Sequence, residues 1–275
     1  MKNVAFGQYY PAKSPLHAMD ARVKVVMAVL YIVVAFLCKT GVAFGALLLS
    51  AVILLALSRI PVKIVLRSLR PLFFIMLFTA LLNLFFTGGE TVLFSVWKIT
   101  VYREGVANAV FMLVRILVLI FGTGVFLTYT TTPIALTDAI ESLLSPLRVI
   151  RLPVHEFAMM MSIALRFIPT LSEETEKIMN AQKARGVDFS SGGLIRRVKA
   201  LVPILIPLVV SAFRRADELA TAMECRCYRG GKGRTRMTVP HVHAGDIVAL
   251  FLMIGLGVGI FFLNRVPLVW WGISV

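Results

Sequence analysis

Five long apolar runs constrain the fold of this chain more than any other feature. They cover residues 25–38, 42–58, 72–89, 105–132 and 247–264. Each run approaches the roughly 20 residues that an α-helix needs to cross a bilayer, and the first is the shortest. The chain is 59% hydrophobic and 16% charged, with a mean hydropathy of +0.87, which is too apolar for a soluble domain. We therefore predict an all-α integral membrane protein with about five transmembrane helices, six or seven being the alternative count.

The positive charges indicate how these helices are oriented. The chain has 29 Lys and Arg against 14 Asp and Glu, a formal net charge of +15 that nucleic acid, anionic lipid or membrane topology could each explain. If the N-terminus is cytoplasmic and the chain crosses at every run, 24 of the 29 cations lie inside, four lie outside and Arg115 lies within the fourth run. Cytoplasmic segments carry such an excess of Lys and Arg. We therefore expect a multi-pass protein of the cell membrane, with its N-terminus and residues 128–245 in the cytoplasm.

The interior stretch 128–245 differs from the parts of the chain on either side of it. It holds two apolar patches, 157–165 and 201–213, of which the second contains two prolines and has basic residues on both sides. Segments of this kind fit helices that lie along the interface or on other helices better than they fit spans. The predicted organisation is therefore a region 1–127 with four transmembrane helices, a region 128–245 with long amphipathic cytoplasmic helices, and a region 246–275 with the last transmembrane helix.

Two predicted helix ends in the interior stretch have matching sequences. In both, acidic residues (173, 174 and 176; 217 and 218) come first and basic residues follow, which is the order that complements a helix dipole. We expect the first of these helices to begin near Ser172, after a kink or end at Pro169. The two ends align as Ala181-Gln182-Lys183-Ala184-Arg185-Gly186 and Ala222-Met223-Glu224-Cys225-Arg226-Cys227.

Each end places one arginine between small neighbours, four residues after an alanine. Such an arginine, Arg185 or Arg226, is suited to inserting its planar guanidinium into an acidic pocket of a partner with two parallel hydrogen bonds. The alternative is that each cation only complements the helix dipole, an effect worth about 0.3–1 kcal/mol.

Several segments resemble the transmembrane T component of energy-coupling factor (ECF) transporters, which are ABC-type importers of vitamins and metals. The similar segments are Gly7-Gln8-Tyr9-Tyr10, Thr131-Thr132-Pro133, Ala164-Leu165-Arg166-Phe167-Ile168-Pro169 and, most specifically, Ala184-Arg185-Gly186. The last is one of the two Ala-Arg-Gly signatures of that family. The second signature would be Cys225-Arg226-Cys227, which keeps the arginine and replaces both neighbours, so the geometry of this second helix end stays open.

The resemblance implies a subunit that is not itself an enzyme. Two ABC ATPase subunits, as a homodimer or a heterodimer, would bind ATP and Mg²⁺ and hydrolyse the nucleotide, while a membrane S component would capture the substrate. This chain would bind no cofactor and would transmit motion between them through cytoplasmic coupling helices. Arg185 and Arg226 would each pair with an acidic residue in a groove of one ATPase. The Gly-Gln-Tyr-Tyr segment looks more like the shared modules that serve several vitamin-binding subunits than like dedicated cobalt or nickel systems.

The same resemblance implies a contact with the S component through the two apolar patches. The candidate residues are Met159, Met160, Met161, Leu205 and Leu208. Methionine suits such a surface because its side chain is flexible and tolerates different partners. Ordinary packing between helices is the alternative for these side chains.

A self-sufficient secondary transporter or channel is the alternative function. It would need a pathway within its own spans, but the five runs lack carboxylates, show no obvious inverted repeat and contain one charge, Arg115. For Arg115 we expect one of three arrangements: hydrogen bonds to backbone carbonyls, a hydrogen bond to Asn83 or Asn108, or extension of the side chain to the membrane interface.

Catalysis, metal binding and nucleic-acid binding are not predicted. The cysteines at 225 and 227 and the histidines at 241 and 243 do not have the usual spacing of zinc ligands. The glycine-rich stretch 230–234 is no P-loop, and the cations follow the membrane topology rather than a nucleic-acid motif. The expected non-protein partner is the lipid bilayer, where Lys63, Arg67 and Arg70 share one face of a short helix near the headgroups.

Overall fold

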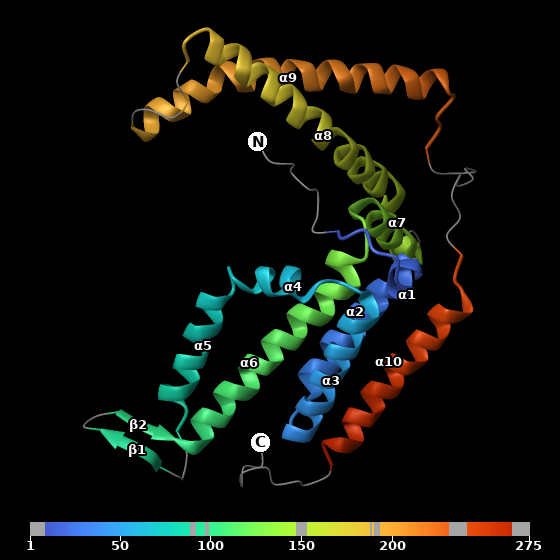
Figure 1. Ribbon diagram of the computed structural model, residues 1–275. Coiled ribbons are helices and arrows are strands. Elements are labelled where there is room, and N and C mark those ends of the chain that lie inside the picture. Colours follow the sequence, from blue (N-terminus) through green and yellow to red (C-terminus); the bar gives the residue numbers. More distant parts are fainter. Residues whose placement is uncertain are drawn as a thin grey trace. The chain divides into compact units, whose positions relative to one another are not determined.

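The computed structural model describes residues 9–88, 92–96, 99–146, 153–187, 189, 193–230 and 241–265 (Figure 1). The chain divides into two compact units. One comprises Met1–Ser142 together with Thr238–Val275, and the other comprises Leu143–Met237. The first unit therefore combines the N-terminal part of the chain with the last helix.

The first unit is built from helices with one short hairpin. Its elements are α1 (Pro15–Ala18), α2 (Ala21–Leu37), α3 (Gly41–Ser58), α4 (Val62–Leu69), α5 (Phe73–Phe86), β1 (Val92–Val96), β2 (Ile99–Tyr102), α6 (Arg103–Thr123), the π-helix η1 (Gly124–Tyr129), α7 (Pro133–Leu144, whose last two residues fall beyond the division) and α10 (Ala244–Leu263). Helix α2 contacts α6, η1 and α10, while α3 contacts α6 and α10, and α5 packs on α6 (Figure 1). The all-α membrane fold class is confirmed.

The antiparallel hairpin is an addition that helical periodicity did not predict. Strands β1 and β2 pair with Val96 opposite Ile99 and connect α5 to α6. The hairpin lies between two of the predicted apolar runs, in a segment where β-branched residues are frequent and strand formation is locally favourable.

Three of the five predicted spans have the length and composition to cross a membrane. Within the described residues, they are α3, α10 and the continuous 27-residue segment Arg103–Tyr129, which consists of α6 and η1. Helices α4 and α5 meet the criterion together as a pair bent by 62°, which makes a fourth span if the pair is one. Helix α2, which contains most of the first apolar run, has 17 residues and carries Arg22 and Lys24 in its first turn. That this helix spans the membrane therefore remains a prediction.

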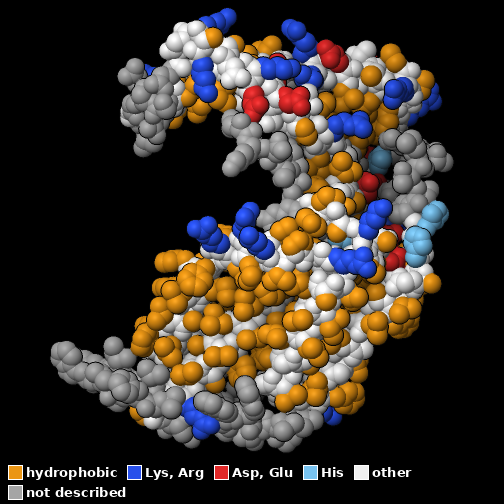
Figure 2. Space-filling model, viewed as in Figure 1, with side chains coloured by type: hydrophobic (Ala, Val, Ile, Leu, Met, Phe, Trp, Pro, Cys, Tyr) orange, Lys and Arg blue, Asp and Glu red, His pale blue; other side chains and the backbone are white. Residues whose placement is uncertain are grey.

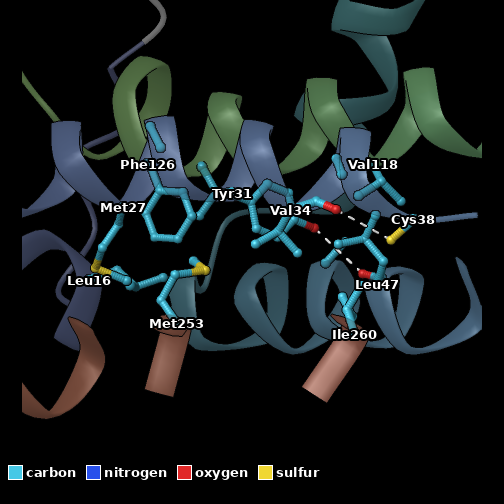
Figure 3. Packing of buried hydrophobic residues seen from close by; sticks show 14 of the residues in the cluster. Leu16, Met27, Tyr31, Val34, Cys38, Leu47, Val118, Phe126, Met253 and Ile260 are labelled. Atoms are coloured by element: carbon cyan, nitrogen blue, oxygen red, sulfur yellow. Dashed lines mark hydrogen bonds between the residues drawn. The ribbon is translucent and has the colours of Figure 1, made fainter. Parts of the chain in front are cut away.

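The core of the first unit surrounds Tyr31 of α2. Its ring is fully buried and meets Phe126 of η1 edge to face, with ring centroids 6.1 Å apart (Figure 3). Met253 and Ile260 of α10 complete the cluster from the other side. Gly122 permits this packing because a Cβ at that position would overlap the Tyr31 ring. The close approach of α2 and α6 therefore depends on a residue without a side chain.

Two buried charged groups tie the start of α2 to other segments: Lys24 to the segment after η1, and Asp246 to the start of α10. Lys24 is 2% exposed and donates from Nζ to the Thr130 carbonyl oxygen at 2.9 Å. The neighbouring carboxylate of Asp246 is also 2% exposed and accepts from the His243 amide at 2.9 Å and the Asp20 amide at 3.4 Å. Buried charges are retained when hydrogen bonds satisfy them, and these bonds fasten three separate segments together.

Arg115 satisfies a backbone carbonyl, one of the predicted alternatives. Its Nη2 donates to the Cys38 carbonyl oxygen at 3.0 Å, just beyond the end of α2, and its guanidinium carbon lies 5.2 Å from the Phe44 ring centroid. Asn264 bonds the same turn, donating to the Leu37 carbonyl oxygen at 2.7 Å. The last carbonyls of a helix have no partner within it, so both side chains stabilise the turn between α2 and α3.

Gly122→Ala should destabilise the protein by about 1–3 kcal/mol, because the added methyl group overpacks the core against Tyr31. Thermal unfolding of the detergent-purified chain measures this. Gly259→Ala in α10 is the matched control, because nothing lies within 4 Å of the added Cβ there, and it should be neutral or slightly stabilising. Equal effects of the two substitutions would contradict the proposed packing.

Candidate functional site

The second unit contains two long helices, α8 (Val154–Ala184) and α9 (Leu194–Cys225). Helix α8 runs without a break through Pro169, so the prediction of a new helix near Ser172 is wrong. Helix α9 likewise contains Pro203 and Pro207. A proline removes one hydrogen bond and bends a helix, but a long amphipathic helix with tertiary contacts can continue through it. The two helices are about 46 and 48 Å long at 1.5 Å per residue.

The two helices contact each other at an ion pair. Arg215 Nη2 of α9 lies 3.3 Å from Glu174 Oε2 of α8, and the two side chains are 34% and 29% exposed. Figure 1 shows the helices crossing, with their C-terminal ends leaving the crossing in opposite directions in the view. The ion pair connects interior positions of the two helices, away from the ends of both.

The end of α8 is a Schellman motif. The Gly186 amide donates to the Lys183 carbonyl oxygen at 3.0 Å, and the Val187 amide donates to the Gln182 carbonyl oxygen at 3.1 Å. Gly186 has φ +87°, the left-handed conformation that this motif requires after the last helical residues. The orphan carbonyls of the helix are thereby satisfied, and Arg185 stands at the C-cap.

The end of α9 repeats this motif bond for bond. The Cys227 amide donates to the Glu224 carbonyl oxygen at 2.8 Å, and the Tyr228 amide donates to the Met223 carbonyl oxygen at 3.0 Å. Cys227 has φ +55°, so it adopts the left-handed conformation without being glycine. The geometry of this second helix end was left open by the sequence. The structure shows that the motif forms with Cys225 and Cys227 in place of alanine and glycine. Arg226 is therefore held at the C-cap as Arg185 is.

Both arginines are exposed, and the described residues offer neither guanidinium a hydrogen bond or an ion pair. Ala184 and Gly186 beside Arg185 are also exposed, and nothing lies within 4 Å of the position of a Cβ on Gly186. Cys225 and Cys227 beside Arg226 are free, exposed thiols. Each helix thus ends in an accessible guanidinium on a fixed backbone, the arrangement that bidentate recognition of a carboxylate needs.

The ion pair and the two arginines occupy equivalent positions of one internal repeat. Arg215 follows Glu174 by 41 residues, the same offset that separates Arg226 from Arg185. When two related elements pack around a two-fold axis, equivalent positions contact each other at that axis. Because each arginine lies 11 residues beyond its member of the pair, both stand about 16 Å along their helices from the contact. The ion pair was not predicted from the sequence, although the 41-residue offset between the two helix ends could have indicated it.

The five residues predicted to contact another membrane subunit lie on these two helices. Met160 and Met161 of α8 are 57% and 40% exposed, and Met159 is half-buried. Leu205 of α9 is 56% exposed and Leu208 is half-buried. Larger side chains beside them are even more exposed, including Phe157 and Phe213. Ordinary packing between α8 and α9 therefore does not bury these patches, which together exceed the scattered apolar exposure of a soluble surface.

The fold and the site together define an integral membrane protein that carries two long helices with exposed apolar faces and exposed arginine ends. The family model described as CbiQ, cobalt transport protein, matches residues 12–237. Proteins named energy-coupling factor transporter transmembrane protein EcfT are similar along the chain. The one from Clostridium kluyveri is 48% identical over 273 residues, covering 99% of both chains.

Two other relatives with the same name support this match. The protein from Ruminiclostridium cellulolyticum is 52% identical over 237 residues, covering 86% of this chain and 88% of its own. The protein from Acidaminococcus fermentans is 46% identical over 274 residues, covering 99% of both. This chain belongs to the family of energy-coupling factor transporter transmembrane proteins.

Gly186→Ala and Cys227→Gly should change the stability of the helix ends in opposite directions. A side chain costs about 1–2 kcal/mol in the left-handed conformation, so the first change should weaken the end of α8 and the second should strengthen the end of α9. Hydrogen exchange of the amides of residues 187 and 228 measures this. Cys225→Gly is the control, since glycine within the helix is destabilising. A loss of protection in Cys227→Gly would show that the left-handed cap is not under strain.

Proposed function

We propose that this chain is the coupling subunit of an ECF-type ABC importer, and that it transmits ATP-driven motion from two cytoplasmic ATPases to a membrane S component. The observation that carries the proposal is the pair of matched helix ends, in which Arg185 and Arg226 are presented on the same backbone geometry. Two equivalent exposed guanidiniums suit two similar partner subunits, whether these form a homodimer or a heterodimer. The S component would supply recognition of the substrate, and a vitamin is the proposed substrate class.

Each arginine would dock into an acidic groove of one ATPase. Docking would bury a guanidinium against a carboxylate with two hydrogen bonds, which gives both strength and a defined angle. The flanking residues Ala184, Gly186, Cys225 and Cys227 are small enough to let the groove close around the helix end. ATP and Mg²⁺ would be bound and hydrolysed by the ATPases, and this chain would supply no catalytic group. The proposal places residues 128–245 and the N-terminus in the cytoplasm, as the distribution of Lys and Arg favours.

The crossing would convert the movement of one end into the movement of the other. When the ATPases close on ATP and open after hydrolysis, the two docked ends change their separation. Because α8 and α9 are long, hydrogen-bonded rods joined by Glu174 and Arg215, a change at the ends would alter the angle at which they cross. The exposed patches at 157–165 and 201–213 would move with the helices. They would then shift an S component packed on them.

A self-sufficient transporter or channel is less well supported. Its strongest candidate group was Arg115, and this side chain is engaged with the Cys38 carbonyl oxygen and the Phe44 ring. A charge inside a span often marks a transport pathway, but here it has a structural role at the turn between α2 and α3.

Arg185→Ala combined with Arg226→Ala should leave the chain inserted in the membrane but lower copurification of the ATPases at least about 10-fold, because each ATPase groove loses its charged partner. Affinity purification of the transporter and a vitamin uptake assay in cells measure the effect. Lys177→Ala combined with Lys199→Ala removes the same charge from exposed positions on α8 and α9 and should preserve binding. Unchanged copurification and uptake in the arginine variant would falsify the docking role.

Glu174→Arg and Arg215→Glu should each lower uptake about 2- to 5-fold while the ATPases remain bound, because like charges then face each other at the crossing. The double exchange Glu174→Arg with Arg215→Glu restores opposite charges and should restore uptake. Uptake in proteoliposomes containing the whole transporter separates the three variants. If the double exchange transports no better than either single variant, the crossing pair does not position the two helices.

A further inference from the structure

Helix α4 is held on the first unit in one rotational position. Val65 is fully buried and Ile60, just before the helix, is 5% exposed. Ser68 Oγ accepts a hydrogen bond of 2.9 Å from the hydroxyl of Tyr129, a residue that is itself 2% exposed. One face of the eight-residue helix is thus fixed by two apolar side chains and one hydrogen bond. The directions of its remaining side chains follow from this contact.

The fixed rotation turns three cations outward along one face. Lys63, Arg67 and Arg70 are exposed and follow each other at the helical spacings of four and three residues. A fourth cation, Arg59, is exposed at the end of α3 immediately before α4. Within the described parts of the chain, none of the four forms an ion pair. No Asp or Glu occurs anywhere between residues 21 and 89, so the segment itself supplies no neutralising charge.

A third face of α4 is apolar and exposed. Val62 and Leu66 are each 55% exposed and lie between the cationic face and the buried face. Helix α5, bent by 62° from α4, continues with exposed Phe73, Phe74 and Phe86. Figure 2 shows Lys and Arg side chains gathered at α4 along the border of this hydrophobic surface. A helix with adjoining apolar and cationic faces at such a border is typical of a membrane interface.

We propose that Lys63, Arg67 and Arg70, with Arg59 beside them, form a binding site for the phosphate of an anionic phospholipid headgroup. The positive-inside tendency explains how many cations lie on this side, but it does not require them to share one face beside exposed apolar side chains. A lipid matches both features, because its phosphate meets the guanidinium and ammonium groups while its acyl chains cover Val62 and Leu66. A soluble anion would leave the apolar face uncovered, and an acidic protein surface would have to enter the headgroup region.

The test measures which lipids the intact chain retains. The chain is reconstituted in vesicles with equal amounts of phosphatidylglycerol and phosphatidylcholine, extracted in mild detergent and analysed by mass spectrometry of the bound lipids. The wild-type chain should be enriched in phosphatidylglycerol. The triple variant Lys63→Gln, Arg67→Gln, Arg70→Gln should lower this enrichment about 10-fold or more, given three cations at the surface. Millimolar inorganic phosphate should not displace the lipid.

Two further variants separate a lipid site from general charge. The variant Arg166→Gln, Lys177→Gln, Lys199→Gln removes three exposed cations from α8 and α9 and should retain the enrichment. The exchange Lys63→Arg, Arg67→Lys, Arg70→Lys keeps the charge and should also retain the enrichment in phosphatidylglycerol. That result would show that the loss in the α4 glutamine variant does not come from repacking of α4. Equal losses in both glutamine variants, no loss in either, or displacement by inorganic phosphate would overturn the proposal. Unchanged lipid retention in the α4 glutamine variant, together with loss of the ATPases when the same variant is purified as the whole transporter, would also overturn the proposal and would assign the face to a protein partner.

Discussion

The need to satisfy backbone hydrogen bonds at helix ends governs this structure, both in the apolar spans and outside them. A bilayer offers no water to the last carbonyls of a helix, so they must find partners in the protein. At the turn between α2 and α3, these partners are the side chains of Arg115 and Asn264. At the ends of α8 and α9, the backbone itself supplies them through two Schellman motifs. The same requirement thus explains a charge within a span and the two rigid bases on which Arg185 and Arg226 stand.

The internal repeat connects these helix ends to the proposed function. Equivalent positions of α8 and α9 meet in the Glu174–Arg215 ion pair, and equivalent arginines occupy the two ends. A single chain can therefore present two matching docking groups without being a symmetric dimer. The two ends still differ chemically, because glycine follows one arginine and Cys227 follows the other in the same left-handed conformation. The two proposed ATPase contacts would be geometrically alike, but their helix ends would differ in stability.

Much of the architecture could be predicted from the pattern of residues. Apolar runs located α3, α6 and α10, and the order of acids, bases and small residues located the ends of α8 and α9. The prediction of a new helix near Ser172 failed, because α8 continues through Pro169. The hairpin of β1 and β2 was also missed, because a short strand pair between two apolar runs has no strong periodic signal. The predicted docking and contact residues stay predictions, although all eleven lie on α8 and α9 or at the C-terminal ends of these helices, within one unit.

The sequence by itself determined the membrane fold class, the surplus of cations over acidic residues and the presence of two similar helix ends, since each depends on composition or on neighbours close along the chain. Only the tertiary structure decided which residues meet. It placed Gly122 against Tyr31, Glu174 against Arg215 and Ser68 against Tyr129. It also showed that a cysteine can cap α9 as glycine caps α8. These outcomes depend on contacts between residues far apart in the chain and on the backbone conformation those contacts permit, which local patterns do not specify.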